Sequence, residues 1–316
     1  RMKRQRWKDV AAFLVILFLL PYVFTLLAAG AGEGRKESGK SSVQVTVAGE
    51  GYEENISLTE YLTGALAAQM PAGYEPEALK AQAVLVRTYY ELHEKEQKVI
   101  GEEDSQPYLS GRQLKELWGE AYDENYRRLE QAVTDSGYEC ISYGDKMAEP
   151  FYHAVSAGRT RSGAEVFHDD SYAYLASVEC PSDITAENYV TIRKFTIKEV
   201  YTILQQDGGL PEDVTAQAAD AVWNEVTRDG AGYIVTWKPA GQTIHGEKLR
   251  TLLGLPSACF EAEPWDEGIR FVCRGRGHGL GMSLYEANQL AVEGKDYKQI
   301  LKYFFKDITI SPPQDE

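Results

Sequence analysis

The 316-residue chain has little that points to nucleic acid or to a metal cluster. Its formal net charge is −15, and no run of basic residues is interleaved with aromatic ones, which argues against a nucleic-acid partner. There are four cysteines and no CxxC pair, so a zinc knuckle has little support. The cysteines are Cys140, Cys180, Cys259 and Cys273.

Positive charge is concentrated at the start of the chain. Residues 1–9, RMKRQRWKD, hold five basic groups and one acid, and residues 10–29 form an apolar run of the length that spans a bilayer. We therefore expect a cytosolic flank at 1–9, a transmembrane signal-anchor at 10–29, and a flexible tether at 30–42. The remainder would lie on the extracytoplasmic side of the cell membrane. A cleaved signal peptide is the alternative, since Leu27-Ala28-Ala29 offers small residues to a peptidase.

Export bears on the cysteines. One or two disulfides and buried free thiols are about equally expected in an exported domain. Cys259 and Cys273 flank the sequence EAEPWDEG, which resembles a hairpin tip, so cross-strand proximity of the two is one possibility.

The remaining pattern predicts an α+β class, because helices and antiparallel strands are segregated along the chain. A strand is expected at 43–47, and Ser57-Leu-Thr-Glu60 matches a capping box that starts a helix. A single domain would span 43–306, with a disordered tail at 307–316. Further expected elements are helices at 111–136, 195–205, 212–225, 283–292 and 297–305, strands at 138–142, 151–155, 174–178 and 269–273, and a hairpin from 232–237 and 242–245.

A break between two helices falls at Met70-Pro71. Gly73 supplies a turn, and Pro76 suits the first position of the next helix. Gln69 stands at this hinge. Taken alone, a helix end broken by proline most often marks topology only.

Two segments carry polar or glycine-rich patterns. RGRGHGLGMSLYEA, residues 274–287, has four glycines within seven residues, which permit positive φ and the close approach of another backbone. It does not follow a βαβ strand, so a dinucleotide site is not expected. FYHAVSAGRTRSG, residues 151–163, places His153 and Ser156 on opposite faces of a strand, which argues against a nucleophilic pair. Two interpretations of this segment stay open: its polar side chains line a cleft, or His153 is a core histidine whose hydrogen bonds are made within the protein.

Together these segments resemble the stage II sporulation protein D / amidase-enhancer (SpoIID/LytB) family. EYLTGALAAQMPAGYEPEALKAQAVLVRTYY resembles its opening signature, FYHAVSAGRT its FHSTSGGxT pattern, and GRGHGLGMSLYEANQLAVEG its GxGHGVGMSQYGA block. The resemblance spans roughly residues 43–305. It implies a lytic transglycosylase that acts on denuded glycan strands of peptidoglycan during sporulation and engulfment.

In this family the catalytic acid is a glutamate in a segment of the type SEMP, and that position falls on Gln69 in AAQMP. A carboxamide can donate a hydrogen bond to the glycosidic oxygen but cannot release a proton near neutral pH. The enzyme activity implied by the family is therefore attenuated or absent in this chain, unless Glu75 or Glu77 supplies the acid. The alternative is a non-catalytic glycan-binding scaffold or amidase enhancer.

Some family members bind zinc through His and Cys. Here Arg159, Ala164 and Glu165 occupy the stretch after His153, so we expect neither metal nor cofactor. Arginines of the two loops suit the lactyl carboxylate of stripped muramic acid, or else merely offset neighbouring acids. The expected partners are glycan strands and, as further candidates, other engulfment proteins or a cell-wall amidase. The predicted substrate-binding residues are Arg87, His153, Ser156, Arg159, Thr160, Arg274, Arg276, His278, Ser283 and Tyr285.

Overall fold

The computed structural model describes residues 43–49, 52–100, 105–206, 226–238, 243–266 and 268–313. Residues from Gln44 onward form one compact unit. No helix in these ranges is long and apolar enough to cross a membrane. The predicted flank, anchor and tether at 1–42, and the expected helix at 212–225, lie outside the described residues.

The described chain begins with a hairpin that leads into a helix. Strand β1 (Gln44–Gly49) pairs antiparallel with β2 (Tyr52–Ser57), and α2 (Leu58–Gln69) follows at once. Ser57 Oγ accepts a hydrogen bond of 3.2 Å from the backbone N–H of Glu60, which satisfies one of the free donors at the helix start. The expected strand and helix cap are confirmed.

The break after α2 is an ordered turn. Met70 is extended, with φ −139° and ψ 137°, and α3 (Pro76–Tyr89) begins with proline at its first position. The guanidinium of Arg128 donates to the backbone oxygens of Ala72 and Tyr74, at 3.1 and 2.9 Å. The hinge predicted from Pro71 and Gly73 is therefore held from the side. Helix α3 continues into a π-helical turn, Tyr90–Glu94.

The single helix predicted at 111–136 is wrong. The structure has α4 (Gly111–Trp118) and α5 (Tyr122–Asp135), separated by a 3₁₀ turn at Gly119–Ala121. Gly119 has φ +52°, a conformation that a right-handed helix does not contain and that glycine adopts at little cost.

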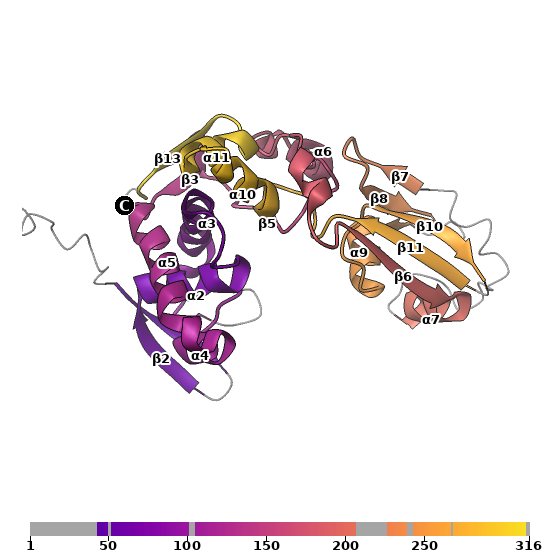
Figure 1. Ribbon diagram of the computed structural model, residues 1–316. Helices are drawn as coiled ribbons and strands as arrows, with labels where there is room; N and C mark the ends of the chain where they lie inside the picture. The colour runs from indigo at the N-terminus through magenta and orange to yellow at the C-terminus, as the bar shows by residue number, and fades with distance from the viewer. Residues whose placement is uncertain are drawn as a thin grey trace, which may run out of the picture. The chain divides into compact units, whose positions relative to one another are not determined.

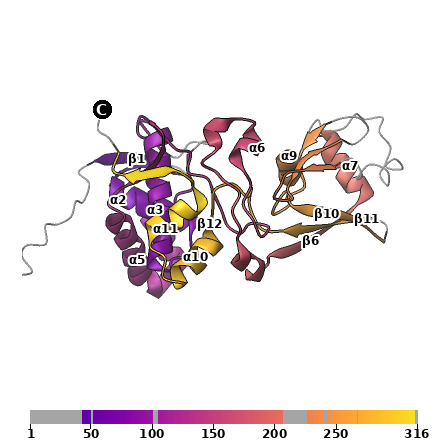
Figure 2. The same ribbon diagram turned by 90° about the horizontal axis from the view of Figure 1, so that it is seen from above.

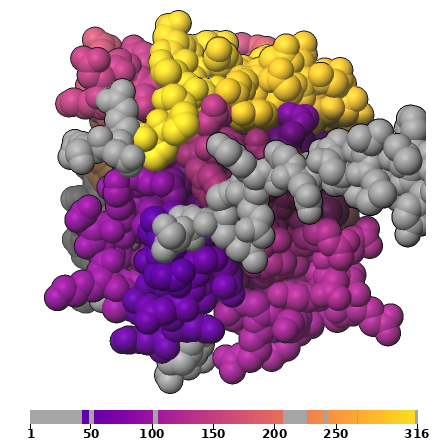
Figure 3. Space-filling model, turned by 90° about the vertical axis from the view of Figure 1, so that its left-hand side faces the viewer, coloured from indigo at the N-terminus to yellow at the C-terminus, as the bar shows by residue number. Residues whose placement is uncertain are grey.

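The tail also differs from its prediction. Strand β13 (Ile308–Ser311) pairs antiparallel with β3 (Cys140–Tyr143), whose other neighbour is β4 (Lys146–Met147). In Figure 3 the yellow C-terminal segment accordingly adjoins the magenta one. Residues 308–311 are ordered because their backbone groups complete a sheet edge, which local composition does not reveal.

The middle of the chain is less regular than expected. Strand β5 is only Tyr152–His153, and it pairs in parallel with β12 (Met282–Ser283). After α6 (Gly163–Phe167), residues 174–178 form no strand. Tyr174, Leu175 and Val178 are buried, and Leu175 makes one bridge to Phe305, so the apolar pattern reflects burial rather than a ladder.

A second core lies between two three-stranded sheets and their helices. Its elements are β6 (Val190–Thr196), α7 (Ile197–Gln206), β7 (Val226–Arg228), β8 (Ile234–Trp237), β9 (Ile244–His245), α9 (Gly246–Leu252), β10 (Phe260–Trp265) and β11 (Gly268–Arg274). The sheet orders are β10-β11-β6 and β7-β8-β9, and buried Trp237, Phe260 and Phe271 fill the space with α7 and α9. The hairpin expected around 232–245 and the strand at 269–273 are confirmed, whereas Phe195 belongs to a strand and the helix starts two residues later.

The last two helices pack on the core that the first helices of the described chain form. Helices α10 (Leu284–Val292) and α11 (Tyr297–Phe304) both pack on α3, which also contacts α2 and α5 (Figures 1 and 2). Helix α3 is therefore surrounded, and Ala81, Val84 and Leu85 are at most 1% exposed. The α+β class with antiparallel strands is confirmed.

All four cysteines are buried and free in this structure. Burial raises the pKa of the Cys140 thiol to about 11 and that of Cys273 to about 12, so both stay protonated at neutral pH. Of the two alternatives expected for the cysteines, disulfides or buried free thiols, the structure shows buried free thiols.

Candidate functional site

Gln69 ends α2 with its side chain held on two sides. Gln82 of α3 donates from Nε2 to Gln69 Oε1 at 2.7 Å, and Gln69 Nε2 donates to Gln106 Oε1 at 3.1 Å. The Gln69 side chain is half-buried, whereas Gln82 and Gln106 are buried. The hinge therefore presents an oriented carboxamide.

The hinge lies beside the middle of α10. The backbone N–H of Glu75 donates to Asn288 Oδ1 at 2.7 Å. Burial raises the pKa of Tyr74, the charges of Tyr285 and Asp183 raise it further, and Arg276 opposes them. Asn288 belongs to the block GRGHGLGMSLYEANQLAVEG, so the Glu75–Asn288 bond brings two of the motifs found in the sequence into one region.

The two glutamates considered as substitute acids differ in their surroundings. Glu75 is exposed at the hinge. The Glu77 carboxylate bonds to Lys80 Nζ at 2.5 Å and accepts from the backbone N–H of Tyr297 at 2.9 Å. Glu77 thus stabilises the start of α11, while Glu75 stands at the end of the hinge, directly before α3. Acid catalysis by either residue stays a prediction.

The glycine-rich segment is packed against the strand-and-loop segment. Gly281 has φ +69°, and a Cβ there would lie 1.9 Å from the backbone oxygen of Phe151. Arg276 and Val155 exchange two backbone hydrogen bonds, of 2.7 and 3.1 Å. The close backbone approach that the glycines permit is therefore used by the chain's own strand.

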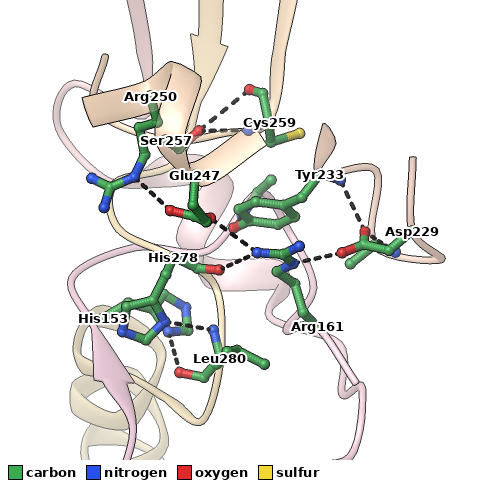
Figure 4. A network of polar contacts seen from close by, with 12 residues as sticks. His153, Arg161, Asp229, Tyr233, Glu247, Arg250, Ser257, Cys259, His278 and Leu280 are labelled. Carbon is green, nitrogen blue, oxygen red and sulfur yellow. Dashed lines mark hydrogen bonds and ion pairs between the residues drawn. The ribbon is translucent and has the colours of Figure 1, made fainter. Parts of the chain in front are cut away.

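Two histidines lie under this contact with their tautomers fixed (Figure 4). His153 Nδ1 donates to the backbone oxygen of Leu280 at 3.0 Å, and His278 Nδ1 accepts from the N–H of Leu280 at 3.1 Å. Burial lowers the pKa of His153 to about 3 and that of His278 to about 4. Both rings are neutral at physiological pH. Among the described residues His153 Nε2 has no hydrogen-bond partner.

Arg161 joins three segments at the same place. Its Nε lies 2.5 Å from Asp229 Oδ2, and a terminal nitrogen donates to Glu247 Oε1 at 3.0 Å and to the backbone oxygen of His278 at 3.2 Å (Figure 4). The guanidinium also lies 5.0 Å from the ring centre of Tyr233. With 4% of its side chain exposed, Arg161 is a structural ion-pair centre.

The other arginines of the two loops are more exposed. Arg159 pairs with Glu179, and Arg274 lies 3.9 Å from Glu261. Arg276 is exposed, and no described acidic side chain lies within 4 Å of its guanidinium. Of the four loop arginines, Arg276 has the surroundings that a ligand carboxylate requires.

The predicted hydroxyl residues have internal partners. Ser283 Oγ donates to Asp183 Oδ1 at 2.8 Å, Ser156 Oγ accepts from the N–H of Gly158 at 3.1 Å, and Thr160 Oγ1 donates to the backbone oxygen of Ala176 at 3.0 Å. All three are buried, so they build the loops. Tyr285 is half-buried, and its hydroxyl lies 3.4 Å from Thr185 Oγ1. A substrate contact of these residues stays a prediction.

Two carboxyl groups at this site were missed by sequence reasoning. Asp183 is fully buried and also accepts from the backbone N–H of Ser156 at 2.6 Å; Glu286 accepts from the N–H of Ser182 at 2.8 Å. Burial raises the pKa of both. Glu286 had a signal, the spacing Ser-x-x-Glu of a helix cap, whereas Asp183 comes from a loop without any pattern.

A zinc site does not fit the residues present. His153 is buried with Nδ1 committed to Leu280, and the Cys180 thiol is bonded at 3.8 Å to the backbone oxygen of Val178. Within the described ranges, no three His, Cys, Asp or Glu side chains are grouped as metal ligands would be.

Comparison with known proteins decides the family. The profile of the stage II sporulation protein family (SpoIID) matches residues 49–143. Stage II sporulation protein D of Bacillus subtilis (strain 168) is 34% identical over 268 residues, which cover 82% of this chain and 75% of that protein. The corresponding protein of Bacillus amyloliquefaciens is 33% identical over 267 residues, with the same coverage.

The chain belongs to the SpoIID family. An uncharacterized protein of Brachyspira hyodysenteriae is also similar, with 28% identity over 262 residues, 81% of this chain and 67% of that protein. The matched profile includes the hinge with Gln69 and ends before the glycine-rich segment.

One predicted residue of the SpoIID signature lies further along α3. The Arg87 guanidinium pairs with Glu91 and lies 5.3 Å from the ring centre of Tyr90. Its side chain is 12% exposed, and among the described atoms its Nε has no hydrogen-bond partner. Arg87 is thus largely committed to its own helix, and its contact with a substrate stays a prediction.

Proposed function

We propose that this SpoIID-family protein binds denuded glycan strands of peptidoglycan at the hinge after α2, with Gln69 in the position of the family's catalytic glutamate. The observation that carries the proposal is the oriented carboxamide of Gln69, bonded at 2.7 and 3.1 Å to two other amides. Tyr74, in the same hinge, supplies an aromatic ring, and exposed Arg276 of the glycine-rich segment supplies a cation with no described acidic side chain within 4 Å.

The chemistry follows from the residue at position 69. In a lytic transglycosylase, one carboxyl group protonates the glycosidic oxygen and then takes the proton of the sugar's 6-hydroxyl as that oxygen closes onto C1. Gln69 can donate a hydrogen bond to the glycosidic oxygen but can neither give nor take the proton. Loss of a positioned general acid costs about 10²–10⁴-fold in rate. The protein is therefore attenuated as a transglycosylase, and binding dominates its action.

A second candidate function is a non-catalytic scaffold or amidase enhancer. It is favoured because the Gln69 amide bonds to two other amides and Glu77 bonds to Tyr297, so neither offers a free carboxyl group at the hinge. In this role the protein would hold a stripped strand for a cell-wall amidase or another engulfment protein.

Membrane attachment through residues 10–29 belongs to the same proposal. It rests on the apolar run and its basic flank, and it would place the site on the extracytoplasmic side, where peptidoglycan lies.

Co-sedimentation with peptidoglycan tests the binding. The full chain, purified in detergent, should sediment with amidase-treated sacculi and less with untreated sacculi. Arg276→Gln should weaken that binding several-fold, while Arg270→Gln, which removes a cation paired to Glu263, should not. Equal sedimentation with both sacculi, or equal loss in both variants, would rule out recognition of stripped glycan at this site.

A further inference from the structure

A chain of hydrogen bonds runs from Gln69 to a buried carboxylate. Glu94 is 1% exposed, and its oxygens accept from Tyr61 Oη at 2.6 Å, from Gln106 Nε2 at 3.0 Å and from the backbone N–H of Gln106 at 2.9 Å. Burial and the charge of Glu94 raise the pKa of Tyr61, so the phenol keeps its proton and donates it. Glu94 is therefore an acceptor in every one of these contacts.

This carboxylate fixes which way the amides point. Gln106 must turn its nitrogen to Glu94, where it also reaches the backbone oxygen of Val86 at 3.3 Å, and so turns its oxygen to Gln69. Gln69 must then donate to Gln106 and accept from Gln82. Reversing Gln106 would set its oxygen against Glu94, and reversing Gln69 would set two oxygens together.

Position 69 is thus a site for a group that donates on one side and accepts on the other. A carboxamide meets this requirement, and so does a protonated carboxyl group. An ionised carboxylate has only acceptors, so it would face the oxygen of Gln106 without a donor.

We propose that Glu94 and Gln106 are positioning residues that impose the hydrogen-bond pattern of a protonated carboxyl group on position 69. Gln69 fits because it has the same shape and the same donor and acceptor as the acid form. A glutamate placed there would hold its proton to a higher pH than an exposed glutamate does, as a general acid must. The pattern itself rests on the contacts above, and only its use in glycan cleavage rests on the proposed function.

Other charged groups face this region from the elements packed around it. Arg128 of α5 reaches the hinge oxygens of Ala72 and Tyr74, and its charge favours an ionised carboxylate. Burial raises the pKa of Tyr74, the charges of Tyr285 and Asp183 raise it further, and the charge of Arg276 lowers it, so charges of both signs act on the hinge. Glu94 acts in the same direction as the hydrogen-bond pattern, since its negative charge disfavours a second carboxylate.

The test is a carbon-13 NMR titration of Gln69→Glu in the full chain, labelled at the glutamate carboxyl. The signal absent from the parent reports position 69. We expect its midpoint at least one pH unit above the ordinary glutamate value of about 4.3, a tenfold higher proton affinity. In Gln69→Glu/Glu94→Gln the new amide can donate to Gln106, which lets Gln106 reverse and donate to position 69. The midpoint should then fall by at least one unit.

A matched control removes a carboxylate outside the chain of bonds. Glu139, 14% exposed, is bonded to Lys298 Nζ and Tyr297 Oη at 2.8 Å each, and Gln69→Glu/Glu139→Gln should titrate like Gln69→Glu. If the Glu94→Gln variant does not fold, Gln69→Glu/Gln106→Leu replaces it. This change removes the oxygen that the protonated carboxyl group donates to, so the midpoint should again fall, but by less, because leucine offers position 69 no donor.

An ordinary or lower midpoint in Gln69→Glu, or a midpoint unmoved by either second change, would overturn the proposal. The titration needs neither glycan nor cleavage, so its result is independent of whether the protein acts on peptidoglycan.

Discussion

The carboxamide nitrogen of Gln69 lies 3.1 Å from the side-chain oxygen of Gln106, and the bond between them joins the hinge after α2 to the buried Glu94. The hinge amide is thereby locked in one orientation by residues far from it in the sequence. Substitutions around this amide, and around the buried ion-pair centre at Arg161, are expected to change stability by different amounts.

Replacing Arg161 should lower the free energy of unfolding more than replacing the exposed Arg159 does. Arg161→Met leaves Asp229, 1% exposed, as an uncompensated buried charge. Breaking such a pair costs about 3–5 kcal/mol. Arg159→Met, which removes a partner of the exposed Glu179, should cost no more than about 1 kcal/mol. Urea denaturation of both variants measures the difference, and equal losses would contradict the assigned role of Arg161.

Adding one methyl group at Gly281 should destabilise the contact between the glycine-rich segment and β5. The new Cβ would meet the backbone oxygen of Phe151 at 1.9 Å, in addition to the strain of a positive φ. Gly294→Ala is the matched control, since its φ is +88° and no atom lies within 4 Å of the added Cβ. We expect about 1–2 kcal/mol for Gly294→Ala and clearly more for Gly281→Ala in thermal unfolding.

Stability should fall as pH drops from 6.5 toward 4, because His153 and His278 are held neutral. Their folded pKa values, about 3 and about 4, lie below the unfolded value, so the unfolded chain takes up protons first. Their contribution is fully present above pH 6.5. At pH 5 the contribution of each histidine to the free energy of unfolding should be about 2 kcal/mol lower than at pH 6.5.

Two variants isolate this pH effect from the carboxyl groups. His153→Gln should flatten the dependence of the unfolding free energy between pH 7 and 5, whereas His168→Gln, at an exposed position, should leave it unchanged. Parallel curves for the parent and His153→Gln would show that His153 is protonated in the folded state.

The contact between the hinge and α10 can be tested at a single amide. Asn288→Ala removes the acceptor of the Glu75 N–H, so hydrogen exchange at Glu75 should accelerate and stability should fall by about 1 kcal/mol. Gln289→Ala, at the next and half-buried position, should change neither. Unchanged exchange in Asn288→Ala would mean that this bond does not hold the hinge.

Local signals in the sequence were enough to predict the elements around Gln69. Ser57 with Glu60 marks a helix start, Pro76 marks the next one, and the four glycines of residues 275–281 mark a close backbone approach. Each of these features is set by residues only a few positions apart in the sequence, so the local sequence is enough to predict it.

Contacts between distant segments could not be predicted in the same way. Asp183 binds Ser283 across a sequence separation of 100 residues, and strand β13 exists because β3 offers it an edge. The same holds for Gln82 and Gln106, which were absent from the predicted site although both contact Gln69. Glutamine has no preferred local pattern, and only the fold brings these side chains together.

The most direct test of the account is product analysis for Gln69→Glu. The full chain and the variant are incubated with amidase-stripped glycan strands, and anhydro-muramic products are sought by mass spectrometry. The account predicts that the parent binds but cleaves at least about 10²-fold more slowly than Gln69→Glu. Equal cleavage by both proteins would show that another acid does the work and that position 69 is not the catalytic position.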